Sequence, residues 1–258
     1  MKDFTVELHI ARKAAGEAAK VIKSQFGRPQ DVSIKGDSNT LVTSTDKAAE
    51  TAILDVLREE SPYRILSEES GLTGAGNGPV WVVDPLDGTS NFARSLPLFA
   101  VSIALVEGSD ILVGVIVDPI HDREYFASRG GGAFINGRPL TTAEMVHPVP
   151  MLFLNHGSGP EDVKKFAVIT RHLTSGFRIR KLGTTALELC YVATGLYDGF
   201  ICSGDELWDF AAGALIASEA GCIFTDWKGR KWDGAGNFIL ITRTAIHAQL
   251  LSVTFDLQ

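Results

Sequence analysis

Trp81-Val82-Val83-Asp84-Pro85-Leu86-Asp87-Gly88-Thr89 joins an apolar run to two aspartates three residues apart. Residues 80–83 are apolar and mostly β-branched, so they are predicted to form a buried strand that ends at Asp84. Pro85 and Gly88 shape a sharp turn, so both acidic side chains can face one small volume. Carboxylates that close repel each other unless a cation lies between them, and hard divalent cations prefer oxygen ligands. The segment therefore predicts a metal site, whereas the ordinary alternative is a solvated Asp-Pro-x-Asp-Gly turn.

The composition is that of an acidic globular chain. It has 258 residues, of which 45% are hydrophobic, and a formal net charge of −7. This size suits one large or two small domains with an ample core. The negative charge and the lack of a Lys/Arg cluster argue against a surface that binds nucleic acid. An acidic protein can still bind a phosphate ester if metal ions supply the positive charge.

Cysteine usage and the start of the chain indicate the compartment. Cys190, Cys202 and Cys222 are odd in number and lack C-x-x-C spacing, which argues against a disulfide framework and for a reducing environment. The first residues lack the apolar segment of a signal peptide, and no run approaches the length of a membrane span. We therefore expect a soluble, cytoplasmic protein that does not bind a membrane.

Hydrophobic periodicity predicts helices first, then consecutive strands, then alternating elements. Helices are expected at 3–26 and at 46–60, the second with Ser44 or Thr45 as its N-cap. Strands are expected at 99–106, 111–117 and 124–127, with a hairpin turn at Asn136-Gly137. Further along, helices are expected at 162–173, 184–193, 210–220 and 245–253, and strands at 197–202, 223–225 and 238–241. The pattern predicts layered sheets and helices in a single domain, 1–258, with a soft internal boundary near 141–159.

Two polar stretches are predicted to be loops. Residues 35–39 are polar, and residues 71–78 read Gly-Leu-Thr-Gly-Ala-Gly-Asn-Gly. Nucleotide-binding glycine loops follow a strand and open a helix, whereas this one precedes a strand and lacks Gly-Lys-Ser/Thr. Residues 71–78 are therefore predicted to be a mobile surface loop.

Other acidic residues stand at the ends of predicted elements. Glu68 follows a short apolar run, and Asp46 begins the second helix. Asp209 lies in Leu207-Trp208-Asp209-Phe210-Ala211-Ala212-Gly213, where it can cap a helix. Asp205 and Glu206 precede it. Taken singly, Asp209 is most simply a helix cap and Glu68 a solvated surface acid.

Five segments, taken together, resemble the motifs of the inositol monophosphatase family in the family's order. Asp84-Pro85-Leu86-Asp87-Gly88-Thr89-Ser90-Asn91-Phe92 resembles the first signature, and Trp208-Asp209-Phe210-Ala211-Ala212-Gly213 with Glu219-Ala220-Gly221 resembles the second. Leu66-Ser67-Glu68-Glu69-Ser70 is similar to the segment that carries a metal-ligating glutamate. The remaining matches are an N-terminal segment, Leu41-Val42-Thr43-Ser44-Thr45-Asp46, and the loop at the substrate ring, Leu182-Gly183-Thr184-Thr185-Ala186.

The resemblance implies a layered α/β fold, an αβαβα sandwich shared with fructose-1,6-bisphosphatase. It also implies a phosphoric monoester hydrolase that uses two or three Mg²⁺ ions and metal-activated water on a small phosphorylated metabolite, an inositol-1-phosphate-like polyol or sugar phosphate. One ion would be held by Glu68, Asp84 and the Leu86 carbonyl, and a second by Asp84, Asp87 and Asp209. A third would lie on the Glu68 side, bound through waters.

The same resemblance assigns the catalytic and substrate-binding residues. Thr89, paired with Asp46, would orient the attacking water, and Glu68 would be the third catalytic residue. The backbone amides of Gly88 and Thr89 would cradle the phosphate. The implied substrate contacts are Asp87, Gly88, Thr89, Gly183, Thr185, Cys202 and Asp209.

The sequence departs from the family at the polyol-binding positions. Seven residues before Asp209, where animal members carry a glutamate that holds inositol hydroxyls, this chain has Cys202. A thiol is a weak donor and acceptor, so a Cys202 that lines the site predicts a broad substrate range, which Cys202→Glu would shift toward inositol phosphate. Alternatively, Asp205 or Glu206 supplies the carboxylate and Cys202 is a core thiol at the end of its strand.

Other functions stay open at this point. One is hydrolysis of a bisphosphate, fructose 1,6-bisphosphate or 3′-phosphoadenosine 5′-phosphate, with Arg178, Arg180 or Lys181 reaching the second phosphate. Another is binding to transcription machinery, as for some bacterial members. The resemblance also implies a homodimer, with the apolar central strands as the source of the interface, and inhibition by lithium.

Overall fold

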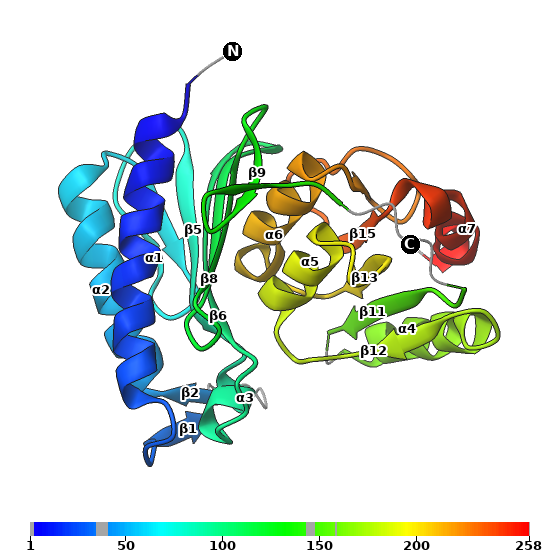
Figure 1. Ribbon diagram of the computed structural model, residues 1–258, viewed down its shortest axis with the longest axis horizontal. Coiled ribbons are helices and arrows are strands. Elements are labelled where there is room, and N and C mark those ends of the chain that lie inside the picture. Colours follow the sequence, from blue (N-terminus) through cyan, green and yellow to red (C-terminus); the bar gives the residue numbers. More distant parts are fainter. Residues whose placement is uncertain (1–2, 35–40, 143–147, 158, 258) are drawn as a thin grey trace.

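The computed structural model describes residues 3–34, 41–142, 148–157 and 159–257, and it arranges them in five layers (Figure 1). Helices α1 (Thr5–Gln25) and α2 (Ser44–Glu60) form the first layer and cover one face of a large sheet. Helices α5 (Thr185–Ala193) and α6 (Leu207–Glu219) lie between that sheet and a smaller one. Helices α4 (Pro160–Leu173) and α7 (Thr244–Thr254) cover the far side of the smaller sheet. The expected αβαβα sandwich is confirmed.

The large sheet has the strand order β10-β9-β8-β7-β6-β5-β3-β4. Only β3 and β5 pair in parallel among its neighbouring strands. Asn136 and Gly137 both have positive φ between β9 and β10, which confirms the predicted hairpin turn. The strands are β3 (Arg64–Ser67), β4 (Gly71–Thr73), β5 (Val80–Asp87), β6 (Ala100–Glu107), β7 (Asp110–Asp118), β8 (Arg123–Ser128), β9 (Gly132–Ile135) and β10 (Arg138–Leu140).

The smaller sheet has the strand order β12-β11-β13-β15-β14. Its strands are β11 (Met151–His156), β12 (Arg178–Arg180), β13 (Gly199–Ser203), β14 (Ile223–Thr225) and β15 (Phe238–Thr242). The stretch 141–159, given above as a soft internal boundary, contains part of the smaller sheet, because it includes β11, where Leu152, Phe153 and Leu154 are buried. The rest of that stretch lies partly outside the described residues.

Three hydrophobic cores separate the layers, and strand alternation assigns side chains to them. In β5, Trp81 and Val83 face α1 and α2, whereas Val82 faces α5 and α6. In β13, Cys202 faces the central helices, whereas Ile201 faces α4 and α7. The central core contains residues of both sheets, so the two halves of the chain are packed against each other there.

Several local expectations need correction. Helix α2 is capped by Thr43, not by Ser44 or Thr45, because the Thr43 side chain and Asp46 form a capping box. Residues 71–73 of the predicted glycine loop form β4, which pairs with β3. The predicted loop at 35–39 lies outside the described residues, between β1 (Val32–Ile34) and β2 (Leu41–Thr43), which form a small hairpin sheet.

The remaining elements are two short helices, α3 (Thr89–Ala93) after β5 and the 3₁₀ helix Phe255–Leu257 after α7. No helix in the described part is long and apolar enough to cross a membrane. The three cysteines are unpaired and buried, as expected for a chain without a disulfide framework.

Candidate active site

Strand β5 carries two of the predicted acidic ligands past an irregularity in its pairing. The strand was predicted to end at Asp84, but it continues to Asp87. Asp84 is opposite Ser102 and Asp87 is opposite Ala100, with a register shift between them. In a regular strand, side chains three residues apart point to opposite faces, and a bulge removes that alternation. Both aspartates consequently line the same cavity.

Glu68 joins them because β3 runs parallel to β5. Ser67 is opposite Val83, and the Glu68 amide donates a 3.0 Å hydrogen bond to the Val83 carbonyl. Adjacent strands lie about 4.8 Å apart, so Glu68 emerges beside Asp84 at the same end of the sheet. Glu68 and Asp84, which come from different predicted elements, thereby meet at one edge of the large sheet.

Asp209 reaches the cavity from the start of α6. It is the third helical residue, and its Oδ2 accepts a 2.7 Å hydrogen bond from the Glu206 amide. The N-cap is Glu206, so the expectation that Asp209 caps the helix itself is wrong by three positions. The capping box fixes the Asp209 side chain, and a carboxylate in the first helical turn is favoured by the helix dipole.

The resulting cavity has a volume of about 320 Å³, and all the charged residues that line it are acidic. Burial raises the pKa of Asp84 well above its usual range, and the charges of Glu68, Asp87 and Asp209 raise it further. Burial also raises the pKa of Asp87 to about 7, although hydrogen bonds from Thr184 and Ala186 oppose that rise. The lining residues are Leu41, Glu68, Asp84, Leu86, Asp87, Gly88, Thr89, Ser90, Gly183 and Asp209.

These donors fit hydrated magnesium ions. Within the described ranges, Asp84, Asp87 and Asp209 form no salt bridge with Lys, Arg or His. The same ranges contain no compact group of three or more His, Cys, Asp or Glu side chains that would form a ready-made metal shell. Magnesium usually keeps several waters and takes only one or two carboxylates plus substrate phosphate, so an open, oxygen-lined cavity suits it better than a closed cage.

Thr89 and Asp46 form the pair that the family resemblance implies. The Thr89 hydroxyl donates to Asp46 Oδ1 at 2.7 Å and lies 3.0 Å from the Leu86 carbonyl. Asp46 Oδ2 accepts hydrogen bonds from the Thr43 amide and hydroxyl. Gly88 precedes Thr89 with φ of 93°, and a Cβ there would lie 2.8 Å from the Leu98 carbonyl oxygen, so glycine is required.

Two residues that the sequence analysis left without roles hold the site together. The Thr184 hydroxyl and the Ala186 amide both donate to Asp87 Oδ2, at 2.5 Å and 2.7 Å. Asn91 Nδ2 donates to the carbonyls of Leu98 and Leu182, at 2.8 Å each. These bonds connect the first signature to the loop before α5. Two features of the sequence could have indicated these roles: Asn91 lies within the first signature, and Thr184 lies at the N-cap of a helix.

The predicted substrate contacts divide into exposed and buried positions. Gly183 lines the cavity, whereas Thr185 is 7% exposed and donates to Asp205 Oδ2 at 2.8 Å. Cys202 has no exposed surface, so the structure gives its thiol no direct contact with a ligand in the cavity. The alternative interpretation, a core thiol at the end of its strand, describes Cys202 instead.

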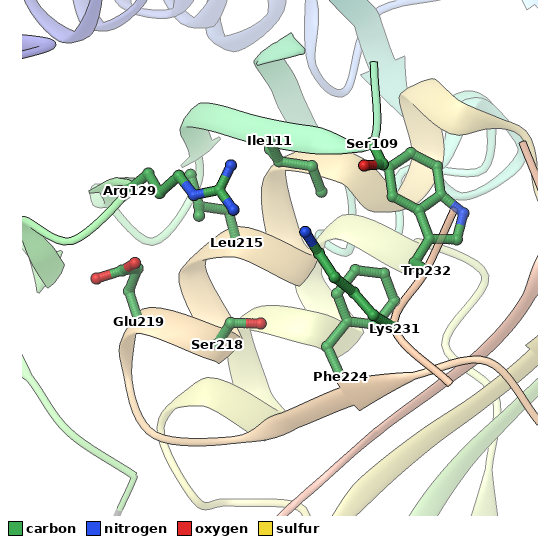
Figure 2. A pocket seen from close by; sticks show the side chains of 9 residues that line it. All are labelled: Ser109, Ile111, Arg129, Leu215, Ser218, Glu219, Phe224, Lys231 and Trp232. Carbon is green, nitrogen blue, oxygen red and sulfur yellow. The ribbon is translucent and has the colours of Figure 1, made fainter. Parts of the chain in front are cut away.

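A second cavity, of about 180 Å³, lies between β7, α6 and residues 231–232. Figure 2 shows Arg129 and Glu219 on one side of it and the rings of Phe224 and Trp232 on the other. Its charged groups already have partners, because Arg129 and Lys231 pair with Asp110 and Glu219 accepts from the Gly130 and Gly132 amides. This cavity lacks the unbalanced charge of the acidic one.

Comparisons with known proteins identify relatives of this chain. The sequence pattern of the inositol monophosphatase family matches residues 5–255. A protein named Nus factor SuhB from Pasteurella multocida is 40% identical over 229 residues, which are 86% of this chain and 85% of that protein. A protein named inositol-1-monophosphatase from Mesorhizobium japonicum is 39% identical over 232 residues, 86% of each chain. The solved structure of an inositol monophosphatase from Anabaena superposes with a TM-score of 0.85 and 32% identity, covering 99% of this chain and 97% of that one.

Proposed function

The chain belongs to the inositol monophosphatase family, and we propose that it is a magnesium-dependent phosphatase of small polyol or sugar phosphate monoesters. The observation that carries the proposal is the acidic cavity, where carboxylates from β5, α6 and the end of β3 converge beside the Thr89–Asp46 pair. A phosphate ester is strongly anionic, so such a cavity can accept it only together with cations.

The residues of the cavity divide between two proposed ion positions. Glu68, Asp84 and the Leu86 carbonyl would hold one ion, and Asp84, Asp87 and Asp209 would hold the second. Bound magnesium supplies positive charge to the phosphoryl oxygens and makes water more acidic. The hydrogen bonds to Asp87 and Asp209 fix one oxygen of each carboxylate and leave the other available as a ligand.

The Thr89–Asp46 pair would orient the attacking water. The single hydroxyl proton of Thr89 is donated to Asp46, so the Thr89 oxygen presents lone pairs that accept a hydrogen bond from water. Asp46 is held in turn by Thr43. The backbone of Gly88 and Thr89 turns at the cavity wall, where its amides would bind the phosphate oxygens.

Phosphate release from purified protein tests this function. We expect turnover of polyol phosphates with Mg²⁺, none after chelation, and none from Asp84→Asn. The matched control is Asp55→Asn, because Asp55 is exposed on α2 and far in sequence from the signatures. Undetectable hydrolysis of every monoester by the magnesium-loaded wild type would reject the proposal.

A bisphosphate substrate is supported less well by the arrangement of cations. Arg178 and Arg180 are exposed on β12, and neither lines the acidic cavity. Burial raises the pKa of Asp205, and the charge of nearby Lys181 opposes that rise. Because the positive charge of Lys181 is already matched by the Asp205 carboxylate, we favour a monophosphate substrate over a bisphosphate.

A second candidate function is binding to transcription machinery, which the relatives named Nus factor SuhB favour. The two functions are separable: an Asp84→Asn variant that loses hydrolysis should retain any such binding. We also propose a single domain, supported by the core shared between the sheets, and a homodimer in a reducing cytoplasm, supported by the family resemblance and by three unpaired thiols. Lithium inhibition is proposed on the resemblance alone.

A further inference from the structure

The second cavity, beside the C-terminal half of α6, has the size and the lining of a site for a small ligand. Its volume is about 180 Å³, and an apolar cavity of about 150 Å³ is large enough to bind a benzene molecule. The apolar part of its lining consists of Ile111, Leu215, Phe224 and Trp232. One aromatic ring with a small substituent therefore fits this volume.

Two aromatic side chains form one wall of the cavity, opposite Arg129 (Figure 2). The ring centroids of Phe224 and Trp232 are 6.1 Å apart, and their planes are inclined by 27°. Trp232 is fixed by an edge-to-face contact with Phe210 and by a 2.7 Å hydrogen bond from its indole Nε1 to the Gly236 carbonyl. This wall is consequently preformed for contact with the face or edge of another aromatic ring.

The charged side chains of the second cavity favour an anionic ligand. Among its described lining residues, Arg129 and Lys231 are cationic and Glu219 is anionic. Both oxygens of Glu219 accept hydrogen bonds, at 2.8 Å and 3.0 Å, from two backbone amides at the turn between β8 and β9. The carboxylate of Glu219 thus has its own donors, whereas Arg129 and Lys231 share the single carboxylate of Asp110.

These two cations can bind a second anion while they remain bonded to Asp110. Arg129 contacts Asp110 through one terminal nitrogen, at 2.7 Å, and a guanidinium group has five N–H donors. Lys231 contacts the other oxygen of Asp110 at 3.0 Å, its side chain is 71% exposed, and an ammonium group has three N–H donors. Figure 2 shows the ends of the Arg129 and Lys231 side chains directed toward each other. A carboxylate that enters between them can therefore contact both.

We propose that the second cavity binds a small aromatic carboxylate, with its ring against Phe224 and Trp232 and its carboxylate between Arg129 and Lys231. The ring supplies flat apolar surface to the aromatic wall, and the carboxylate accepts charge-assisted hydrogen bonds from both cations. The same cations would repel a positively charged ligand. Among the described residues, the second cavity and the acidic cavity share no lining residue, so binding should not require magnesium.

NMR titration of the whole protein with benzoate tests the site, because the indole N–H signals of its four tryptophans report on different places. Trp232 lines the second cavity, whereas Trp208 precedes Asp209 of the acidic cavity. Benzoate should shift the Trp232 signal and not the Trp208 signal, with or without magnesium, and with a Kd of about 1 mM or lower. Benzamide, a neutral molecule of nearly the same shape, should bind at least about fivefold more weakly. The Trp232 signal is identified by its absence from Trp232→Phe.

Two variants, each with a matched control, test the charge and the location. Lys231→Gln should reduce the preference for benzoate over benzamide at least about threefold, whereas Lys228→Gln, an exposed lysine of the same loop, should leave it unchanged. Ser218→Phe places a ring in the cavity from α6 and should abolish the Trp232 shift. Ser252→Phe is its control, because Ser252 is exposed on α7 and, like Ser218, donates to a carbonyl of the preceding helical turn.

Several results would overturn the proposal. Equal affinity for benzoate and benzamide would exclude an anionic ligand, and unchanged binding by Ser218→Phe would exclude this cavity. A shift of Trp208 alone, or binding that requires magnesium, would place benzoate in the acidic cavity. No Trp232 shift at about 10 mM benzoate would reject the site. Thermal unfolding shows whether each variant is folded, and the exposed substitution Lys231→Gln keeps the test decisive if Ser218→Phe does not fold.

Discussion

The acidic side chains near the two cavities beside α6 have opposite electrostatic environments. In the acidic cavity, Asp84 is 2% exposed, and its neighbours Glu68, Asp87 and Asp209 add to the rise in its pKa that burial causes. Beside the second cavity, Asp110 is bonded to the lining residues Arg129 and Lys231, and these bonds lower its pKa. The fold therefore pairs the Asp110 carboxylate with two cations. It leaves a concentration of negative charge in the acidic cavity, which suits a cationic ligand.

The same helix contributes to both cavities, which makes the contrast sharper. Asp209 lies in the first turn of α6, where the helix dipole favours a negative charge. Glu219 is the last residue of α6, where the dipole disfavours one. Glu219 is compensated by two backbone amides, from Gly130 and Gly132. Asp209 accepts one amide hydrogen bond and has several acidic neighbours, so its other oxygen is suited to bind an ion.

The largest effect should come from neutralising the centre of the acidic cavity. Asp84→Asn is expected to reduce kcat at least about a thousandfold, or ~4 kcal/mol, because Asp84 is the proposed ligand of two ions. Its melting temperature without metal should match or exceed that of the wild type, since repulsion is relieved. Magnesium should raise the melting temperature of the wild type but not of Asp84→Asn. Near-normal activity in this variant would remove the basis for the metal assignment.

Placing a carboxylate in the core, with no cation to pair with it, should destabilise the fold without creating a contact with substrate. Cys202→Glu puts a charge at a fully buried position that faces the central helices. We expect a loss of about 3 kcal/mol or more in unfolding free energy, measured by urea denaturation, and no gain in preference for inositol phosphate. Cys202→Ala is the control, with an expected loss of about 1 kcal/mol. A stable Cys202→Glu protein that prefers inositol phosphate would restore Cys202 as a substrate contact.

An intermediate effect is expected at the residue that would orient water. Thr89→Ala should lower kcat about a hundredfold while KM changes by no more than about threefold. Asp46→Asn should act in the same direction, because Asp46 accepts the Thr89 proton. Thr89→Ser, which keeps the hydroxyl, is the control and should recover most of the rate. A change confined to KM would reassign the pair to substrate binding.

The smallest effect on stability should come from breaking the ion pairs of Asp110, beside the second cavity. Asp110→Asn removes a half-exposed carboxylate that two cations share, so unfolding free energy should fall by at most about 1 kcal/mol. Because the folded-state pKa of Asp110 is lowered, its contribution is present at neutral pH and is lost as pH falls through that pKa. Phosphatase activity should not change. A tenfold loss of activity would show that the two cavities are coupled.

Local patterns in the sequence were sufficient to predict most elements and to single out the acidic residues that line the cavity. Strand and helix periods identified β5 to β8 and α5 to α7, because each of these packs one apolar face or stripe into a core. Strand β11 and the short β4 were missed. Strand β4 is only three residues long, and β11 pairs with β12 and β13, which lie far along the chain.

The sequence by itself determined the proposed chemistry, because the carboxylates that we propose as magnesium ligands occur in short motifs whose residue types are visible without a fold. Only the tertiary structure decided which side chains reach the cavity. The irregular register between Asp84 and Asp87 turned both to one side, and the inward face of β13 buried Cys202. Thr184 and Thr185 then connected Asp87 to Asp205. The direction of a side chain depends on strand register and on partners distant in sequence, and neither is encoded in the spacing of a motif.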